Sequence, residues 1–353
     1  MSHIAIAVNP LDLPEIRLAL ADNLSLHTLS ICVRVNKDWY WSFISPLWRE
    51  ITLSVNPENK WPFSTGNTTL DLAVKHKEFI QCLNVEDLNK WKNEESEEFW
   101  SAISGFSTLR SLELGQVYGA QAIVKHESIQ RLGPQYSNLN DLDFDPNINL
   151  ASESYEEILS SCPQLQTLRG GNVKAVVLTE GRSWVCTKLR LWSLGLDFGP
   201  ADDYRGKITK LTESPDSTPS RSTKEEVGQW VEQMRNQVCL QLFGRMSLLV
   251  NLQTADFRVK NLRGCPWPLL LLDHQDSGLE RLLQCPRLKE VMFDWDESEL
   301  ETYDWIKTHW KNININSPPD SADDYDDDED YGFFDNGGYG DYSDYYTSDE
   351  DYY

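Results

Sequence analysis

Histidine and cysteine side chains could supply acid–base, nucleophilic or metal-binding chemistry, and their spacing in this sequence indicates none of these. The six histidines form no His-Glu-x-x-His pattern, and the seven cysteines are scattered without a Cys-x-x-Cys pair. His274 stands two residues before Asp276, a pairing more typical of a surface than of a catalytic triad. There is no Gly-x-Ser-x-Gly elbow and no glycine-rich phosphate loop. The sequence therefore predicts a protein that is not an enzyme and that uses no cofactor or metal.

The charge balance and the hydropathy exclude further classes. The 353 residues include 56 acidic and 32 basic side chains, which gives a formal net charge of −24. Nucleic-acid phosphates would repel such a chain, since no basic stripe stands out in the sequence. No apolar run reaches the length of about 18 residues that a membrane span needs, and no secretory leader opens the chain. Scattered cysteines fit a reducing compartment, so we expect a protein of the cytoplasm or nucleus, or both.

The elements that would position a binding site begin with three short predicted helices near the start of the chain. Pro14 fits the first turn of one helix, with Asp12 and Glu15 spaced as a capping box. Ser25 and Asn36 are placed to cap the second and third helices. Pro46 is expected to stop the third helix. The result is a small helical bundle, which at this size needs a partner or a neighbouring domain to be stable.

The order and spacing of the apolar residues in this bundle resemble an F-box, the adaptor-binding module of SCF-type ubiquitin ligases. The resemblance covers about one seventh of the chain and assigns residues 1–55 to the module. It implies binding to a Skp adaptor and, through it, to a cullin scaffold. The alternative is that these are the first helices of an all-helical domain. The residues that match the family pattern are Leu13, Pro14, Glu15, Ile16, Leu24, Leu29, Val35, Trp39 and Trp48.

Residues 56–316 contain an irregular repeat of the form Leu-x-x-Leu-x-Leu. It recurs from Leu109, Leu139, Leu165, Leu189, Leu252 and Leu288, at intervals of 24 to 63 residues. Four repeats follow a predicted helix, at 98–103, 155–159, 227–243 and 279–283, and Pro163 and Pro286 would end two of these helices. The pattern resembles leucine-rich repeats, which implies an α/β fold of stacked helix–strand units that holds a substrate protein.

Several features depart from that family. Only Asn147 matches the asparagine that closes the usual repeat, Gly170-Gly171 has the composition of a turn, and a polar stretch at 199–226 predicts a mobile insert. An ordinary mixed α/β domain with leucine-containing strands is the alternative.

The residues between the inward positions form the candidate substrate-binding face of such an array. They alternate with buried leucines along each strand, so they point away from the core. Their chemistry is mixed, which suits a protein surface better than a small ligand. The candidates are Glu113, Asp143, Arg169, Ser193, Asp256 and Met292.

The last segment, residues 317–353, is expected to be disordered. It contains 14 acidic residues and eight tyrosines but no lysine or arginine, and so much charge of one sign prevents collapse. It could hold basic proteins, or it could serve only as a solubilising tail.

Taken together, the patterns predict the substrate-recognition subunit of an SCF-type ubiquitin ligase, which acts by holding an unknown target protein near activated ubiquitin. The alternative is a scaffold or chaperone-like binder of basic proteins that uses the repeat face and the acidic tail.

Overall fold

The computed structural model describes residues 9–53, 66–86, 93–115, 123–198, 224–258, 278–293 and 300–317. All of them belong to the first of two units, Met1–Pro318. The acidic tail after Ser317 lies outside these ranges, as do His274 and Asp276 and the predicted mobile insert apart from its last three residues.

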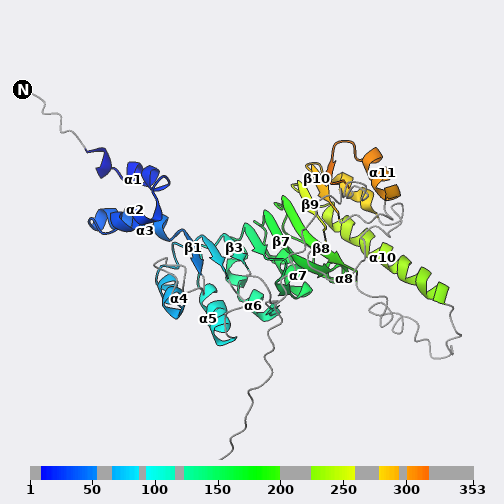
Figure 1. The fold of residues 1–353 in the computed structure, drawn as a ribbon, viewed down its shortest axis with the longest axis horizontal. Helices are drawn as coiled ribbons and strands as arrows, with labels where there is room; N and C mark the ends of the chain where they lie inside the picture. The colour runs from blue at the N-terminus through cyan, green and yellow to red at the C-terminus, as the bar shows by residue number, and fades with distance from the viewer. Residues whose placement is uncertain are drawn as a thin grey trace, which may run out of the picture. The chain divides into compact units, whose positions relative to one another are not determined.

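The described chain is a mixed α/β protein built on a nine-stranded sheet whose strand order equals the chain order. Each strand pairs in parallel with the next one, so the chain must cross back between strands, and a helix or helical turn occupies most of these crossings (Figure 1). The strands are β1 (Glu50–Leu53), β2 (Cys82–Val85), β3 (Ser111–Leu114), β5 (Asp141–Phe144), β7 (Thr167–Lys174), β8 (Leu191–Asp197), β9 (Thr254–Asp256), β10 (Glu290–Met292) and β11 (Asn314–Ile315). A second, two-stranded parallel sheet pairs β4 (Ile123–Val124) with β6 (Asn149–Leu150).

Helices line one side of the large sheet, and α4 to α8 follow one another along it in Figure 1. The helices predicted at 98–103, 155–159 and 227–243 are confirmed inside α5, α7 and α10, whereas 279–283 forms a 3-10 helix. Pro163 and Pro286 each follow the end of a helix, as predicted. These elements are α4 (Gly66–Lys75), α5 (Asn93–Ile103), α6 (His126–Gln130), η3 (Gly133–Gln135), α7 (Ser152–Ser161), α8 (Ala175–Glu180), α10 (Lys224–Met246), η4 (Leu279–Gln284) and α11 (Leu300–His309).

The second position of each repeat forms a continuous ladder through the core. Leu112 pairs directly with Leu142, Leu142 with Leu168, and Leu168 with Trp192, and all four side chains are fully buried. The ladder continues through the second positions of the two later repeats and, at both ends of the sheet, through residues that the repeat pattern did not include. Burial of these aligned side chains against the helices is the main stabilising contribution of the sheet. The whole ladder is Ile51, Leu83, Leu112, Leu142, Leu168, Trp192, Ala255, Val291 and Ile315.

The backbone at the start of the strands repeats as regularly as the core does. The N–H groups of Gln81 and Cys82 both donate to the Arg49 carbonyl, and those of Arg110 and Ser111 both donate to the Gln81 carbonyl. The same shared carbonyl recurs at β5, β7, β8, β9 and β10. It turns the chain so that two successive residues point outward before the strand begins its alternation.

One feature of the predicted repeat is wrong. Gly170 and Gly171 do not form a turn but lie inside β7, at a shift of register between Arg169 and Asn172. Asn147, the one match to the closing asparagine of the usual repeat, is exposed and donates to Asp145 Oδ1 through its backbone and side-chain nitrogens.

The N-terminal helices are α1 (Pro14–Ala21), α2 (Leu26–Cys32) and α3 (Lys37–Trp48), preceded by the 3-10 turn η1 (Pro10–Asp12). Ser25 Oγ accepts the Thr28 N–H at 3.2 Å and Asn36 Oδ1 accepts the Trp39 N–H at 2.9 Å, which confirms both predicted caps.

Two predictions about these helix ends are wrong. Leu13, not Asp12, occupies the cap position of α1, and no side-chain cap bond forms there. Pro46 does not stop α3 but lies inside its last turn, and the helix ends two residues later at Trp48. The missing N–H of Pro46 therefore removes one backbone hydrogen bond near the end of the helix.

The sheet begins inside the predicted 1–55 module. β1 starts at Glu50, two residues after α3 ends, and pairs with β2. Trp48, the last residue of α3, lies in the same buried cluster as Ile51 and stacks on His76, with 4.3 Å between the ring centroids. The end of α3 is therefore part of the sheet core.

Candidate protein-binding surfaces

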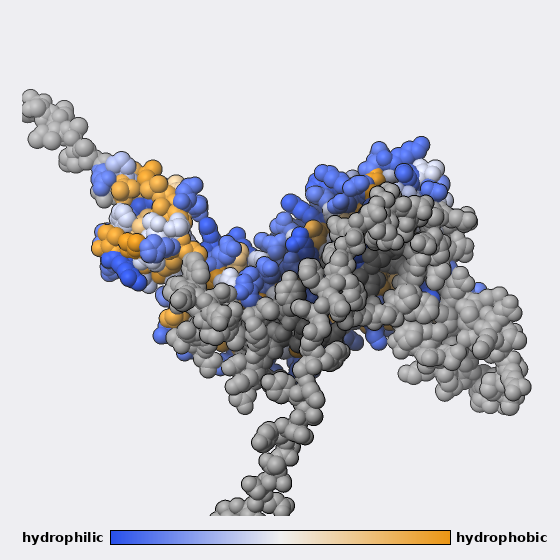
Figure 2. All heavy atoms as spheres, in the orientation of Figure 1, coloured by the Kyte–Doolittle hydropathy of each residue, from blue (hydrophilic) through white to orange (hydrophobic). Residues whose placement is uncertain are grey.

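Helices α1, α2 and the first half of α3 expose an unusual amount of apolar surface. Among the described residues, 15 large hydrophobic side chains are exposed, and nine of these fall between Leu11 and Trp41. Figure 2 shows this apolar surface gathered over the N-terminal helices. Exposed apolar patches on this scale mark interaction surfaces. We call this set the apolar face: Leu11, Leu13, Ile16, Leu18, Leu20, Leu26, Ile31, Val35 and Trp41.

The core beneath the apolar face is small. Its buried residues are Ala21, Leu29, Cys32 and Phe43, with Trp39 packed beside them at 5.4 Å between the Trp39 and Phe43 ring centroids. A core of four buried side chains is too small to enclose all the apolar residues of three helices, so many of these residues remain exposed to solvent.

The structure divides the nine residues predicted to bind the adaptor. Leu24 and Trp39 are half-buried, and Leu29 and Trp48 are buried, so these last two hold the fold and are not presented to a partner. Sequence reasoning did not single out Leu18, Ile31 and Trp41 as part of the binding surface. The usable signal is an excess of apolar residues over what such short helices can bury. The exposed members of the predicted set are Leu13, Pro14, Glu15, Ile16 and Val35.

The six residues predicted to bind a substrate lie in one row across the sheet. Glu113 pairs with Asp143, Asp143 with Arg169, and Arg169 with Ser193. Ser193 then pairs with Asp256, and Asp256 with Met292. Neighbouring strands lie about 4.8 Å apart, so the six side chains follow one another at that spacing on the side opposite the core. We call this row the sheet face.

Only part of the sheet face is open to a partner. Ser193 and Asp256 are buried, although both were predicted as contact residues. Ser193 Oγ donates to Asp256 Oδ2 at 3.2 Å, and the Arg258 guanidinium covers the carboxylate with bonds of 2.9 and 3.0 Å. Glu113 and Arg169 are exposed, and Asp143 and Met292 are half-buried.

The open part of the sheet face carries two carboxylates, those of Glu113 and Asp143, and one guanidinium, that of Arg169. Arg169 Nη1 pairs with Asp143 Oδ2 at 3.0 Å. Partial burial raises the pKa of Glu113, the Asp143 carboxylate raises it further, and Arg169 partly offsets these effects.

We expect Glu113→Gln to raise the melting temperature at neutral pH by about 1–2 °C. The raised pKa means that ionised Glu113 destabilises the fold at every pH above its folded pKa. That cost disappears as the pH falls below the unfolded pKa. Solvent screens this exposed group, so the gain is no more than about 0.5 kcal/mol. Thermal unfolding at neutral and acidic pH measures it, with exposed Glu98→Gln as control; a gain that persists in acid would contradict the assignment.

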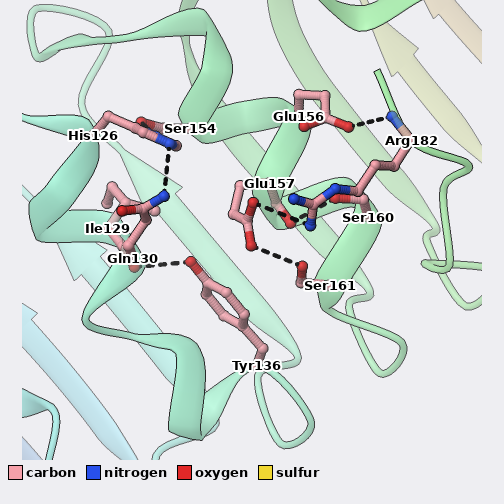
Figure 3. Close-up of polar contacts among 10 residues, drawn as sticks. All are labelled: His126, Ile129, Gln130, Tyr136, Ser154, Glu156, Glu157, Ser160, Ser161 and Arg182. Atoms are coloured by element: carbon pink, nitrogen blue, oxygen red, sulfur yellow. Dashed lines mark hydrogen bonds and ion pairs between the residues drawn. The ribbon is translucent and has the colours of Figure 1, made fainter.

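Polar contacts of His126 and Tyr136 join parts of the helical layer (Figure 3). His126 Nδ1 lies 3.0 Å from Ser154 Oγ, which joins α6 to α7, and its Nε2 lies 3.1 Å from Gln130 Nε2. Tyr136 donates to the Ile129 carbonyl at 2.8 Å, and burial raises its pKa. These contacts brace the helices, and Ser154 is fully buried, so its hydroxyl is not accessible to a substrate.

The described cysteines form no disulfide, and burial raises the pKa of the thiols of Cys162, Cys186, Cys239 and Cys285. Within the described ranges, histidine, cysteine and acidic side chains make no group of three that could hold a metal ion. The described helices also include none with the length and apolarity needed to cross a bilayer.

No protein-family model matches the chain, and a comparison with curated protein sequences finds no match either. The surfaces themselves therefore carry the functional argument.

Proposed function

We propose that the protein is the substrate-recognition subunit of an SCF-type ubiquitin ligase. The apolar face of α1–α3 would bind a Skp adaptor, and the sheet face would hold a target protein. The chain then contributes proximity: it raises the concentration of a target lysine beside activated ubiquitin and needs no catalytic group of its own.

The observation that carries the proposal is the concentration of exposed apolar side chains on a bundle with a four-residue buried core. Burial of such a face against a partner would remove apolar area from water at about 25 cal/mol per Å². The order of Leu13, Pro14, Ile16 and Val35 resembles the F-box, and all four residues are exposed.

The large sheet supports the second half of the proposal. Strand order follows chain order, the repeat positions align in register, and one side of the sheet is covered by helices. These are the features that leucine-rich-repeat-like arrays share, in which each unit contacts mainly its neighbours and leaves a continuous face for a partner.

Point substitutions test the adaptor half better than a truncation. Removing residues 1–51 would also remove Trp48 and half of β1, which belong to the sheet core. We expect Ile16→Asp combined with Val35→Asp to weaken capture of a purified Skp adaptor by about 100-fold or more, since a charge in a desolvated apolar contact is costly. Quantitative pull-down with the full chain measures this.

Ile123→Asp is the matched control for that experiment. Ile123 is 74% exposed. It lies on β4 in the small two-stranded sheet, about 75 residues after the N-terminal helices in the sequence. Capture by this variant should equal that of the unchanged chain. If the unchanged, folded chain captures no adaptor, the ligase proposal fails and a scaffold that binds proteins without ubiquitin transfer becomes the better account.

A further inference from the structure

Basic residues from three distant parts of the sequence meet at the starting edge of the C-terminal strands. Lys188 and Arg190 precede β8, and Arg287 and Lys289 precede β10. Within each pair the intervening leucine, Leu189 or Leu288, is buried while the basic residues are exposed. Both basic side chains of a pair therefore point away from the core. Lys311, three residues before β11, is exposed at the matching position.

We call these five residues the basic edge: Lys188, Arg190, Arg287, Lys289 and Lys311. The equivalent positions on the neighbouring strands β7 and β9 hold only amides, namely Gln164, Gln166, Asn251 and Gln253. No carboxylate occupies any of these nine positions. The chain as a whole has 56 acidic residues and 32 basic ones, so a cluster of five basic residues is unusual in it.

The basic edge forms no ion pair within the described part of the chain. Lys188 Nζ donates to Gln164 Oε1, which is uncharged. The acidic residue that directly follows the edge, Glu290, is instead engaged by the Thr254 hydroxyl and the Asn314 amide, each at 3.4 Å. Clustered cations that form no internal ion pair repel one another, whereas an anionic partner would relieve that repulsion.

The geometry matches an extended chain that crosses the strands. Strands β8 and β10 are two positions apart in the sheet, which at about 4.8 Å per strand separates their basic pairs by about 10 Å. In an extended segment of polyproline II conformation, acidic residues three apart lie on the same face and are separated by about 9 Å, close to the same distance. Arginine and lysine side chains here have the reach to contact such carboxylates.

We propose that the basic edge binds an extended acidic segment of a partner protein, which under the proposed function is the target. A nucleic acid is the less suitable polyanion because the net charge of −24 would repel its longer phosphate backbone. This surface cannot be recognised from the sequence, since the five residues are spread between positions 188 and 311. The register of the sheet brings them together.

The test compares two triple variants of the full chain that remove equal charge. One is Arg190→Gln, Arg287→Gln and Lys289→Gln. The other is Lys75→Gln, Lys77→Gln and Lys125→Gln, three exposed residues away from the basic edge. The probe is a fluorescein-labelled peptide of about 12 residues with Glu at every third position, which in a polyproline II conformation places the carboxylates on one face at the spacing of the edge. Fluorescence anisotropy at low ionic strength measures binding.

We expect the first variant to bind the peptide about ten-fold more weakly and the second to bind like the unchanged chain. Added salt should weaken binding by the unchanged chain. Equal effects of the two variants, or no measurable binding by the unchanged chain, would overturn the proposal. So would a labelled DNA duplex that competes with the peptide and binds the edge more tightly. Adaptor capture by the first variant should be unchanged, so failure here and failure of the adaptor proposal are distinguishable.

Discussion

Trp48→Ala is expected to lower the free energy of unfolding by about 3–5 kcal/mol. Only 6% of Trp48 is exposed, and its ring stacks on His76 within the buried cluster that includes Ile51 and Leu53. Removing the ring leaves a cavity where α3 joins β1, at the first strand of the sheet. Denaturant-induced unfolding, followed by circular dichroism, measures the loss.

His76 provides a second readout of the same substitution. Burial lowers the pKa of His76, while Glu78 acts in the opposite direction. Without the Trp48 ring, water reaches the imidazole and its pKa should rise toward the ordinary value. An NMR titration of the histidines in the full chain measures the shift. An unchanged His76 pKa would show that Trp48 does not shield it.

Trp41→Ala is the matched control, because Trp41 lies on the same helix but is 61% exposed. We expect it to change the free energy of unfolding by less than about 0.5 kcal/mol. It should instead weaken adaptor capture, since Trp41 belongs to the apolar face and large aromatic side chains dominate interfaces. Equal destabilisation by the two tryptophan substitutions would contradict the division of α3 into a core end and a binding end.

The regular part of the sheet could be predicted from sequence because a local pattern determines it. Leu109, Leu112 and Leu114 recur at a spacing that buries all three, and later repeats preserve it. Strands β1 and β11 were missed, since Glu50–Leu53 and Asn314–Ile315 carry too little of the pattern and are recruited by pairing with a neighbour.

The binding surfaces were less predictable because long-range contacts determine their exposure. Ser193 and Asp256 occupy outward positions by alternation, yet Arg258 covers Asp256 after the strand ends. In the N-terminal helices, Leu29 is buried and Ile31 is exposed, and only the packing of α2 on its neighbours decides between them. The pattern gives the direction of a side chain, and the packing gives its accessibility.

Gly170→Ala is the second substitution with a large expected effect, a loss of about 2–4 kcal/mol in the free energy of unfolding. An added Cβ would lie 2.4 Å from Tyr155 Oη and 3.0 Å from Leu194 Cδ2. Tyr155 is fully buried, and its hydroxyl accepts the Gly171 N–H at 3.2 Å, so it cannot move away without breaking a buried hydrogen bond. The shift of register in β7 thus depends on a residue without a side chain.

Two further variants separate this steric conflict from a general intolerance of alanine in place of glycine. Gly133→Ala should leave stability nearly unchanged, because an added Cβ there meets nothing within 4 Å. Tyr155→Phe removes the atom nearest to the new methyl group, so combined with Gly170→Ala it should cost less than the sum of the two single substitutions. Thermal unfolding of the four variants and the unchanged chain gives the coupling energy. Strictly additive losses would mean that Tyr155 Oη is not the group that requires glycine at position 170, and that the contacts with Leu194 Cδ2 and Tyr155 Cε1, each at 3.0 Å from the added Cβ, exclude alanine.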